Sequence, residues 1–220
     1  MKHLLLVTGF SLGALLAGPA AATIAMVDAS SIQGANVLFN NGTQTGALVT
    51  GLTQSGILVD FTGTSNGADV ISANGGQARI EGVADTSTQN PNDTFTLDSL
   101  FFDLANGGLF NNLEFNLFGG TATSANFTLT DNTGGTFTFT NQALGAGSNF
   151  FGFQGTGGES IRDISITLNG GGVQDVRQIR LDELTAAVPE PATWAMMIVG
   201  MGGAGMMLRS RRRAASRPAG

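Results

Sequence analysis

Short runs of alternating apolar and polar residues fill the middle of the chain from Val37 onward. In one such run, Ile57, Val59 and Phe61 alternate with Leu58 and Asp60. A period of two is typical of a β-strand with one face in a core and the other in water. The same pattern recurs at residues 78–81, 113–117, 127–129, 136–140, 164–168 and 179–182. We therefore expect a strand at each of these runs.

The alternation also predicts which side chains point inward. In the run 113–117, Leu113, Phe115 and Leu117 are expected to face the core, and Glu114 and Asn116 to face water. Phenylalanine at such positions is more often part of a core than a platform on which sugars stack. We therefore expect the phenylalanines to serve mainly as core residues.

Asn-Gly pairs separate the runs, at residues 41–42, 66–67, 74–75, 106–107 and 169–170. Both residue types accept a positive φ, which tight turns require. Residues 131–135 link two Phe-Thr runs in a similar way and predict a hairpin. Eight to ten short strands at this spacing indicate an all-β fold, a single β-sandwich that is jelly-roll-like, and no helical period occurs outside the C-terminal tail.

Residues 95–104 interrupt the alternation, because Leu97 and Leu100 do not follow a period of two. A β-bulge adds one residue to a strand and so changes which residues face inward. The pattern therefore predicts either a bulge or a switch of the strand between two sheets.

Charge is distributed unevenly along the chain. Between Asp28 and Val188 there are four basic residues, all arginine, and fifteen acidic ones, a formal charge of −11. A strongly anionic surface repels phosphate backbones and favours solubility. Nucleic acid is therefore not an expected partner.

Missing residue types exclude several kinds of catalytic site. The chain has no Cys, and its one His, His3, lies in the N-terminal segment. Triad catalysis needs an imidazole base, and zinc sites draw on Cys and His. Glycoside hydrolysis needs only two carboxylates, but fifteen scattered acidic residues do not single out a pair. We therefore expect that the protein is not an enzyme, with a glycoside hydrolase as the remaining catalytic alternative.

An oxygen-rich stretch occurs at residues 85–93, where Asp85, Asn90, Asn92 and Asp93 are candidate calcium ligands. Calcium takes carboxylate and amide oxygens of this kind, although the spacing is not that of an EF-hand. The alternative is a solvated loop. No other cofactor is expected.

The N-terminal residues 1–22 have the three regions of a secretory signal peptide. Lys2 and His3 are followed by an apolar run and then by the small residues Ala20 and Ala22, which fit a signal peptidase site. We place the cleavage after Ala22. The alternative, an uncleaved anchor, is disfavoured because the apolar run is shorter than the ~20 residues that span a bilayer.

The C-terminal segment consists of a Pro-Glu-Pro strip, an apolar stretch and a basic end. Proline keeps the residues around Glu190 extended and in water. Residues 192–208 carry no charge and as a helix measure about 26 Å, slightly less than a hydrocarbon core of ~30 Å. Trp194 is expected at one interface, and the Arg cluster at the other consists of Arg209, Arg211, Arg212 and Arg213. By the positive-inside rule, this cluster stays cytoplasmic while the strip faces outside.

Pro189, Glu190 and Pro191, then Trp194, a short apolar helix and the Arg cluster resemble the PEP-CTERM sorting segment in its PEPxxWA variant. The resemblance implies that an exosortase, a membrane-embedded Cys protease or transpeptidase, processes the tail near Pro189 to Pro191. It also implies that the C-terminal helix holds the protein in the membrane before that step. The alternative is a permanent single-span anchor.

These features divide the chain into a signal peptide at 1–22, an acidic all-β sandwich domain at 23–187 and a sorting segment at 188–220. The leading interpretation is an exported cell-surface or extracellular-matrix protein with an adhesion or structural role. It is anchored transiently in the inner membrane and then located in the cell envelope or outside the cell. The alternative is a secreted polysaccharide-binding module, with or without calcium, and the second alternative is a glycoside hydrolase.

Overall fold

The computed structural model describes residues 23–40, 42–75, 78–83 and 96–184. Contacts divide the chain into two units, Met1–Glu183 and Leu184–Gly220, and the fold described below is that of the first. The described residues form fourteen strands and two three-residue 3-10 turns, which confirms the all-β prediction. The expected eight to ten strands are too few, because short strands such as β3 (Gln44–Gly46) are too short to show an alternation.

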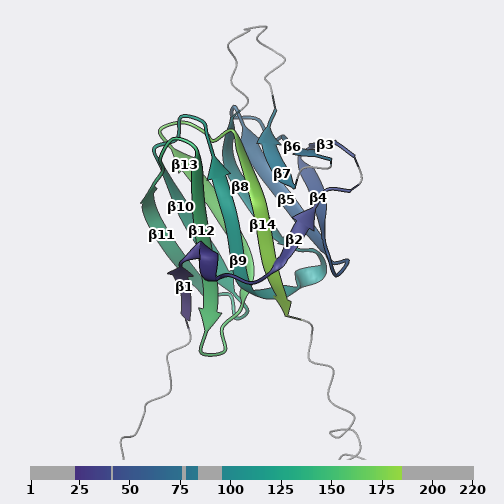
Figure 1. The fold of residues 1–220 in the computed structure, drawn as a ribbon, viewed down its shortest axis with the longest axis vertical. Helices are drawn as coiled ribbons and strands as arrows, with labels where there is room; N and C mark the ends of the chain where they lie inside the picture. The colour runs from purple at the N-terminus through teal and green to yellow at the C-terminus, as the bar shows by residue number, and fades with distance from the viewer. Residues whose placement is uncertain (1–22, 41, 76–77, 84–95, 185–220) are drawn as a thin grey trace, which may run out of the picture. The chain divides into compact units, whose positions relative to one another are not determined.

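Half of the strands form a layer that we call the front sheet, whose central strands face the viewer in Figure 1. Its order is β1 (Thr23–Val27), β12 (Ser148–Thr156), β9 (Leu109–Phe118), β14 (Asp175–Leu184), β7 (Arg79–Gly82), β6 (Ile71–Asn74) and β3. β12 and β9 are antiparallel, with Phe150 opposite Asn116 and Gly152 opposite Glu114. Of β14, only the first part, up to Arg177, pairs with β7.

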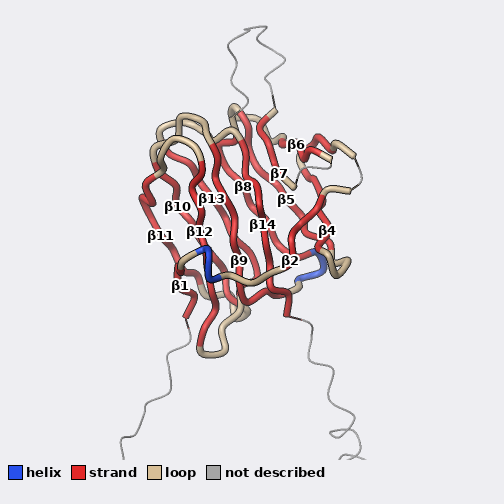
Figure 2. Tube along the Cα trace, viewed as in Figure 1, coloured by secondary structure: helices blue, strands red, loops and turns tan. Residues whose placement is uncertain are grey.

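The other strands form the back sheet. Its order is β11 (Thr136–Ala143), β10 (Ser124–Asp131), β13 (Ile161–Asn169), β8 (Leu97–Leu104), β5 (Leu58–Ser65), β4 (Leu48–Thr53) and β2 (Ala35–Leu38). All of its pairings are antiparallel. Figure 2 shows the strands in red, with loops mainly at the two ends of the layers.

The two layers join at two places. β13 meets β9 through Ile161 and Phe110, and β2 pairs with the second part of β14 as well as with β4. The strands therefore form one continuous hydrogen-bonded network, which is sandwich-like or barrel-like. A jelly-roll strand order stays a prediction.

Phenylalanine rings fill the space between the layers. Phe115 of the front sheet lies 6.4 Å from Phe102 and 5.6 Å from Phe127 of the back sheet, measured between ring centroids. Phe127 in turn lies 5.3 Å from Phe153 of β12. All four rings are fully buried, so the prediction of a phenylalanine core is confirmed for them. Phe150 differs, because 48% of it is exposed.

The predicted irregularity near Leu97 is a β-bulge. The pairing of β5 with β8 shifts by one residue after Thr64, which leaves Asp98 as the extra residue of β8. Because of this shift, Leu97 and Leu100 are both buried although they are three residues apart. The bulge alternative of the sequence analysis is therefore confirmed.

Two of the predicted turns have the backbone that Asn-Gly pairs accept. The φ angles are +50° and +78° at Asn66 and Gly67. They are +67° and +72° at Asn106 and Gly107, which both belong to the 3-10 turn η2 (Ala105–Gly107). The predicted hairpin is also present, and it joins β10 to β11. The residue types at these turns were therefore sufficient to predict where the chain turns.

The expectation that Glu114 and Asn116 face water is wrong. Both are buried, with 5% and 1% of their surface exposed. The 3-10 turn η1 (Ala29–Ser31) packs on the outside of the front sheet at Gly152, which faces Glu114 across the strands. Figure 2 shows this turn in blue in front of β12. Because Gly152 has no side chain, the backbone of η1 can approach the sheet closely and cover Glu114, which lies beside Gly152.

Candidate functional site

The functional residues expected from sequence lie outside the described residues. They are the sorting residues Pro189, Glu190, Pro191 and Trp194, the Arg cluster, the cleavage residues Ala20 and Ala22, and the calcium candidates Asp85, Asn90, Asn92 and Asp93. The expected apolar C-terminal segment, residues 192–208, lies there too. No helix in the described ranges is long and apolar enough to cross a membrane. Within those ranges, no group of three or more His, Cys, Asp or Glu side chains is placed to hold a metal ion.

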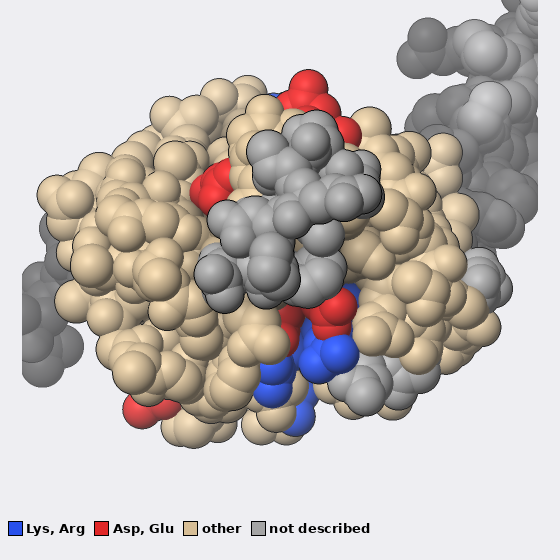
Figure 3. Space-filling view, turned by 90° about the horizontal axis from the view of Figure 1, so that it is seen from above, with Lys and Arg blue, Asp and Glu red and all other residues tan. Residues whose placement is uncertain are grey.

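The outer face of the front sheet gathers most of the basic residues of the domain. Three of the four arginines between Asp28 and Val188 lie here, namely Arg79 on β7 and Arg177 and Arg180 on β14. Each is paired with a carboxylate of the same sheet. Seen from above in Figure 3, blue basic atoms lie directly beside red acidic ones. The arginines of this face are therefore offset by carboxylates, and the face has no net positive charge.

Arg177 is held on two sides. Its Nε and Nη2 donate to the two oxygens of Asp175, a carboxylate with 1% of its surface exposed. Its guanidinium also lies over the ring of Phe118, 3.7 Å from the centroid, a cation–π contact. The hydrogen bonds to Asp175, first of all, raise the pKa of Arg177 above its ordinary value. Arg177 is thus a charged group in a fixed position.

A bulge in β14 presents two neighbouring side chains on this face. Val176 and Ile179 are both buried, and between them Gln178 has a φ of +55°, which a non-glycine residue rarely adopts. Arg177 and Gln178 therefore both lie on the outer side. Such a conformation costs about 1–3 kcal/mol and must be compensated by the surroundings.

The bulge coincides with a change of strand partner. β14 pairs with β7 up to Arg177 and with β2 from Arg180, so β7 and β2 diverge at Gln178. A cavity of about 310 Å³ opens at this fork. It is lined by Asn36, Leu38, Ala78, Arg79, Arg177 and Gln178, and we call it the fork pocket.

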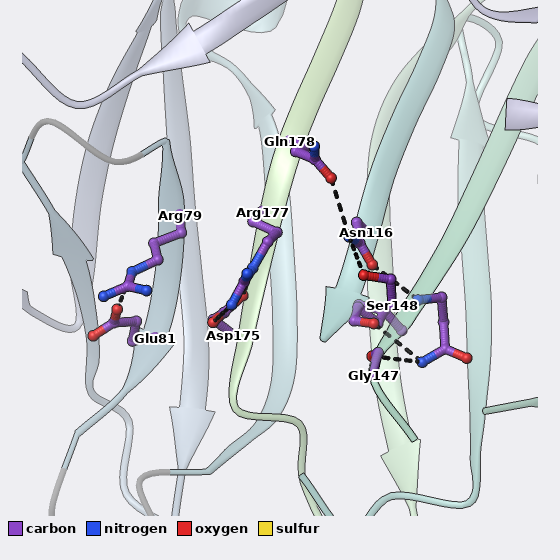
Figure 4. A network of polar contacts seen from close by, with 10 residues as sticks. Arg79, Glu81, Asn116, Gly147, Ser148, Asp175, Arg177 and Gln178 are labelled. Atoms are coloured by element: carbon purple, nitrogen blue, oxygen red, sulfur yellow. Dashed lines mark hydrogen bonds and ion pairs between the residues drawn. The ribbon is translucent and has the colours of Figure 1, made fainter. Parts of the chain in front are cut away.

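Asn116 links the fork pocket to the next strands of the front sheet. Its Nδ2 donates to Oε1 of Gln178 at 3.1 Å and to Oγ of Ser148 at 3.3 Å. The backbone N–H of Asn149 donates to its Oδ1 at 2.9 Å. Figure 4 shows this network running from β14 across β9 to β12. The buried amide therefore fixes the orientation of Gln178.

A second cavity, of about 530 Å³, lies on the same face beside η1. It is lined by Val27, Asp28, Ala29, Ser30, Glu114 and Phe150, and we call it the Phe150 pocket. Arg180 bridges the two cavities, since it donates from Nη1 to Glu114 at 3.2 Å and from Nε to Asn36 at 3.1 Å. The two pockets thus belong to one polar surface.

This surface offers guanidinium and amide donors, carboxylate and amide oxygens, and one exposed aromatic ring. Such an arrangement suits binding of a polar ligand by hydrogen bonds and ring contact. Sequence reasoning missed it. One signal was available: Val176 to Ile179 reads apolar, polar, polar, apolar, which is the pattern of a bulge.

Comparison with known proteins identifies the C-terminal segment. The family model described as the PEP-CTERM protein-sorting motif matches residues 187–213. This segment is a PEP-CTERM sorting motif. The resemblance found from Pro189, Trp194 and the Arg cluster is therefore confirmed. The PEP-CTERM motif supports an exported protein that is held transiently at a membrane and processed by an exosortase-type enzyme.

For the β-domain, the comparisons give only a weak structural likeness. A comparison with curated proteins finds no match for the chain. Among solved structures, the family 11 carbohydrate-binding module of the cellulosomal cellulase Lic26A-Cel5E of Clostridium thermocellum is similar over 77% of this chain and 99% of that module. The sequence identity is 12% and the TM-score is 0.27. A TM-score of this size is too low to relate the two folds strand by strand.

Proposed function

We propose that this chain is an exosortase substrate whose acidic β-domain works at the cell surface or in the extracellular matrix, with an adhesive or structural role. The observation that carries the proposal is the position of the sorting motif. β14, the last strand of the front sheet in chain order, ends at Leu184, and the matched motif begins at residue 187. A cut near Pro189 to Pro191 therefore leaves every described strand in the domain.

Topology supports the same assignment. With the Arg cluster held in the cytoplasm, the Pro-Glu-Pro strip and the domain before it lie outside. A signal peptide at residues 1–22, with cleavage after Ala22, delivers the domain to that side. Both ends of the domain then carry signals for the same destination.

A binding role fits the domain better than a catalytic one. Between residues 23 and 187 there is no His, Cys, Lys or Tyr, so the usual bases and nucleophiles other than carboxylates and hydroxyls are missing. The carboxylates Asp175 and Glu114 of the front sheet are engaged with arginines. What the outer face provides is a set of fixed hydrogen-bonding groups.

The test is the intact mass and terminal sequence of the protein recovered from the envelope and medium of a host that has the exosortase. We expect a chain that begins at Thr23 and lacks the Arg cluster. A Glu190→Gln variant should accumulate with the Arg cluster attached, whereas Glu183→Gln, a matched change outside the motif, should be processed normally. Recovery of the native protein only with its Arg cluster would contradict the proposal.

A further inference from the structure

We propose that the outer face of the front sheet binds an uncharged polysaccharide chain, with the fork pocket and the Phe150 pocket as two ends of one binding surface. The proposal rests on the proposed function in one respect, because the ligand is expected outside the cell. It adds the location of the site and the class of ligand.

The two pockets are connected through the sheet itself. Phe150 faces Asn116 across β12 and β9, so their side chains share the outer face. Asn116 donates to Gln178 in the fork pocket at 3.1 Å. Arg180 makes a second connection, from Glu114 beside Phe150 to Asn36 in the fork pocket. A long polymer that lies along the outer face of the sheet can therefore contact both pockets at once.

The groups on this surface match the two sides of a sugar ring. Arg177, Gln178 and Asn36 present planar donors and acceptors, which form paired hydrogen bonds with neighbouring hydroxyls. Phe150, 48% exposed, presents an aromatic face for the apolar C–H side of a sugar. A ligand with hydroxyls along one edge and C–H groups on its faces uses both features.

Charge decides between neutral and acidic polysaccharides. In and beside the fork pocket, Arg79 and Arg177 are offset by Glu81 and Asp175, so the site offers no net positive charge. The domain around it has a formal charge of −11 between residues 28 and 188. A polyanion is therefore repelled at long range and gains no compensating attraction at the site. An uncharged chain is not repelled by the negative domain and does not need a positive charge at the site.

The donors are fixed before any ligand arrives. Arg177 is clamped between buried Asp175 and the ring of Phe118, and Gln178 is held by Asn116 on a bulge with an unfavourable φ. Groups that are already immobile lose little conformational entropy on binding. A bulge whose conformation costs free energy, and which aims two polar side chains outward, has the character of a functional feature.

The back sheet has a cavity of its own, of about 310 Å³, beside Phe101, which is 37% exposed. Its polar lining consists mainly of hydroxyls, of which Thr64 and Ser99 bond to each other at 2.8 Å. Arginine and amide side chains are absent from its described lining. The front sheet is therefore the better site, and Phe101 supplies a matched control.

The experiment is affinity electrophoresis of the protein recovered from its native host, in gels that contain one soluble polysaccharide each. The neutral panel is mixed-linkage β-glucan, galactomannan, xyloglucan and dextran, and the acidic panel is alginate and polygalacturonate. We expect retardation by at least one neutral polysaccharide, none by the acidic ones, and no effect of EDTA. Lack of retardation in every neutral gel, retardation in acidic gels only, or loss of binding in EDTA would overturn the proposal.

Variants locate the site. Phe150→Ala and Arg177→Ala should each weaken the association constant at least tenfold, whereas the matched controls Phe101→Ala and Arg162→Ala on the back sheet should retain it. Because Arg177→Ala leaves Asp175 buried without its partner, its fold is checked by circular dichroism. Phe150→Ala removes an exposed ring and decides the question by itself. Unchanged binding in Phe150→Ala, or loss of binding in Phe101→Ala, would overturn the assignment to the front sheet.

The two proposals fail separately. A correctly processed protein that binds none of the neutral polysaccharides contradicts only the ligand assignment. A protein that binds one of them but keeps its Arg cluster in the native host contradicts only the processing. Terminal sequencing and electrophoresis of the same preparation give both results.

Discussion

Three aspartates stand side by side on the outer face of the back sheet. Asp103 of β8 lies directly between Asp60 of β5 and Asp163 of β13 in the strand register. Partial burial, first of all, and then the negative charges of both neighbours raise the pKa of Asp103 above its ordinary value of 3.8. The native state therefore binds this proton more tightly than the unfolded chain does. Stability falls as the pH rises from about 3.8 through the folded-state pKa.

Asp103→Asn removes this repulsion. We expect the free energy of unfolding near pH 7 to rise by about 0.2–1 kcal/mol, the usual size of a cross-strand charge effect at a solvent-screened site. The gain should disappear near pH 3, where the wild-type carboxyl is protonated in both states. Urea unfolding at both pH values measures it. Asp69→Asn, the same change at an exposed position, is the control, and an equal gain there would show that general charge repulsion is responsible.

At the scale of single elements, the hairpin between β10 and β11 depends on one carboxylate. Oδ1 of Asp131 accepts hydrogen bonds from the hydroxyl and N–H of Thr133, at 2.8 and 2.7 Å, and from the N–H of Gly135 at 2.8 Å. The hydroxyl of Thr133, first of all, and the backbone N–H groups lower the pKa of Asp131 below its ordinary value. The stabilisation is therefore present above about pH 3.8 and is lost as the pH falls through the folded-state pKa.

Asp131→Ala is expected to lower the thermal midpoint at neutral pH, because three donors of the turn lose their acceptor. Asp131→Asn keeps an oxygen in place and should lose less. The difference between wild type and Asp131→Ala should shrink in acid, as monitored by thermal melts across the pH range. A difference that stays constant down to the lowest pH would contradict a role for the ionised carboxylate.

The 3-10 turn η1 depends on a glycine in the strand beneath it. A Cβ added to Gly152 would lie 2.9 Å from Cα of Ala29, within the backbone of the turn's first residue. Gly152→Ala should therefore displace η1 and cost about 1–3 kcal/mol, as overpacking does. Gly145→Ala is the control, since its nearest contact would be an ordinary 3.7 Å. Chemical denaturation of the two variants compares them, and equal stabilities would contradict the close packing of η1.

At the scale of the whole domain, Phe115 connects the two layers. Its ring contacts Phe102 and Phe127 of the back sheet as well as Phe153 of its own sheet. Phe115→Ala is expected to lower the free energy of unfolding by about 3–5 kcal/mol, through lost burial and the cavity left behind. Phe101→Ala, at a site with 37% exposure, should cost less than half as much. Similar losses in urea unfolding would show that Phe115 is not a central contact.

Local sequence determined much of this protein. Period-two alternation predicted the all-β class, the broken alternation near Leu97 predicted the bulge, and the residues from Asp131 to Gly135 predicted the hairpin. These features depend on neighbours within a few residues, because side-chain direction in a strand and φ in a turn are local properties. The sorting motif is equally local, because it is a short linear segment.

Only the tertiary structure decided what the outer face of the front sheet is. Glu114 is buried because η1, far away in the chain, packs on Gly152 across from it. The fork pocket exists because β14 changes partner from β7 to β2, which brings Asn36, Arg79 and Gln178 together. Strand pairing between distant segments is set by how the two sheets close over a common core. Alternation along the chain predicts which way each side chain of a strand points, but it does not predict which other strand pairs with that strand.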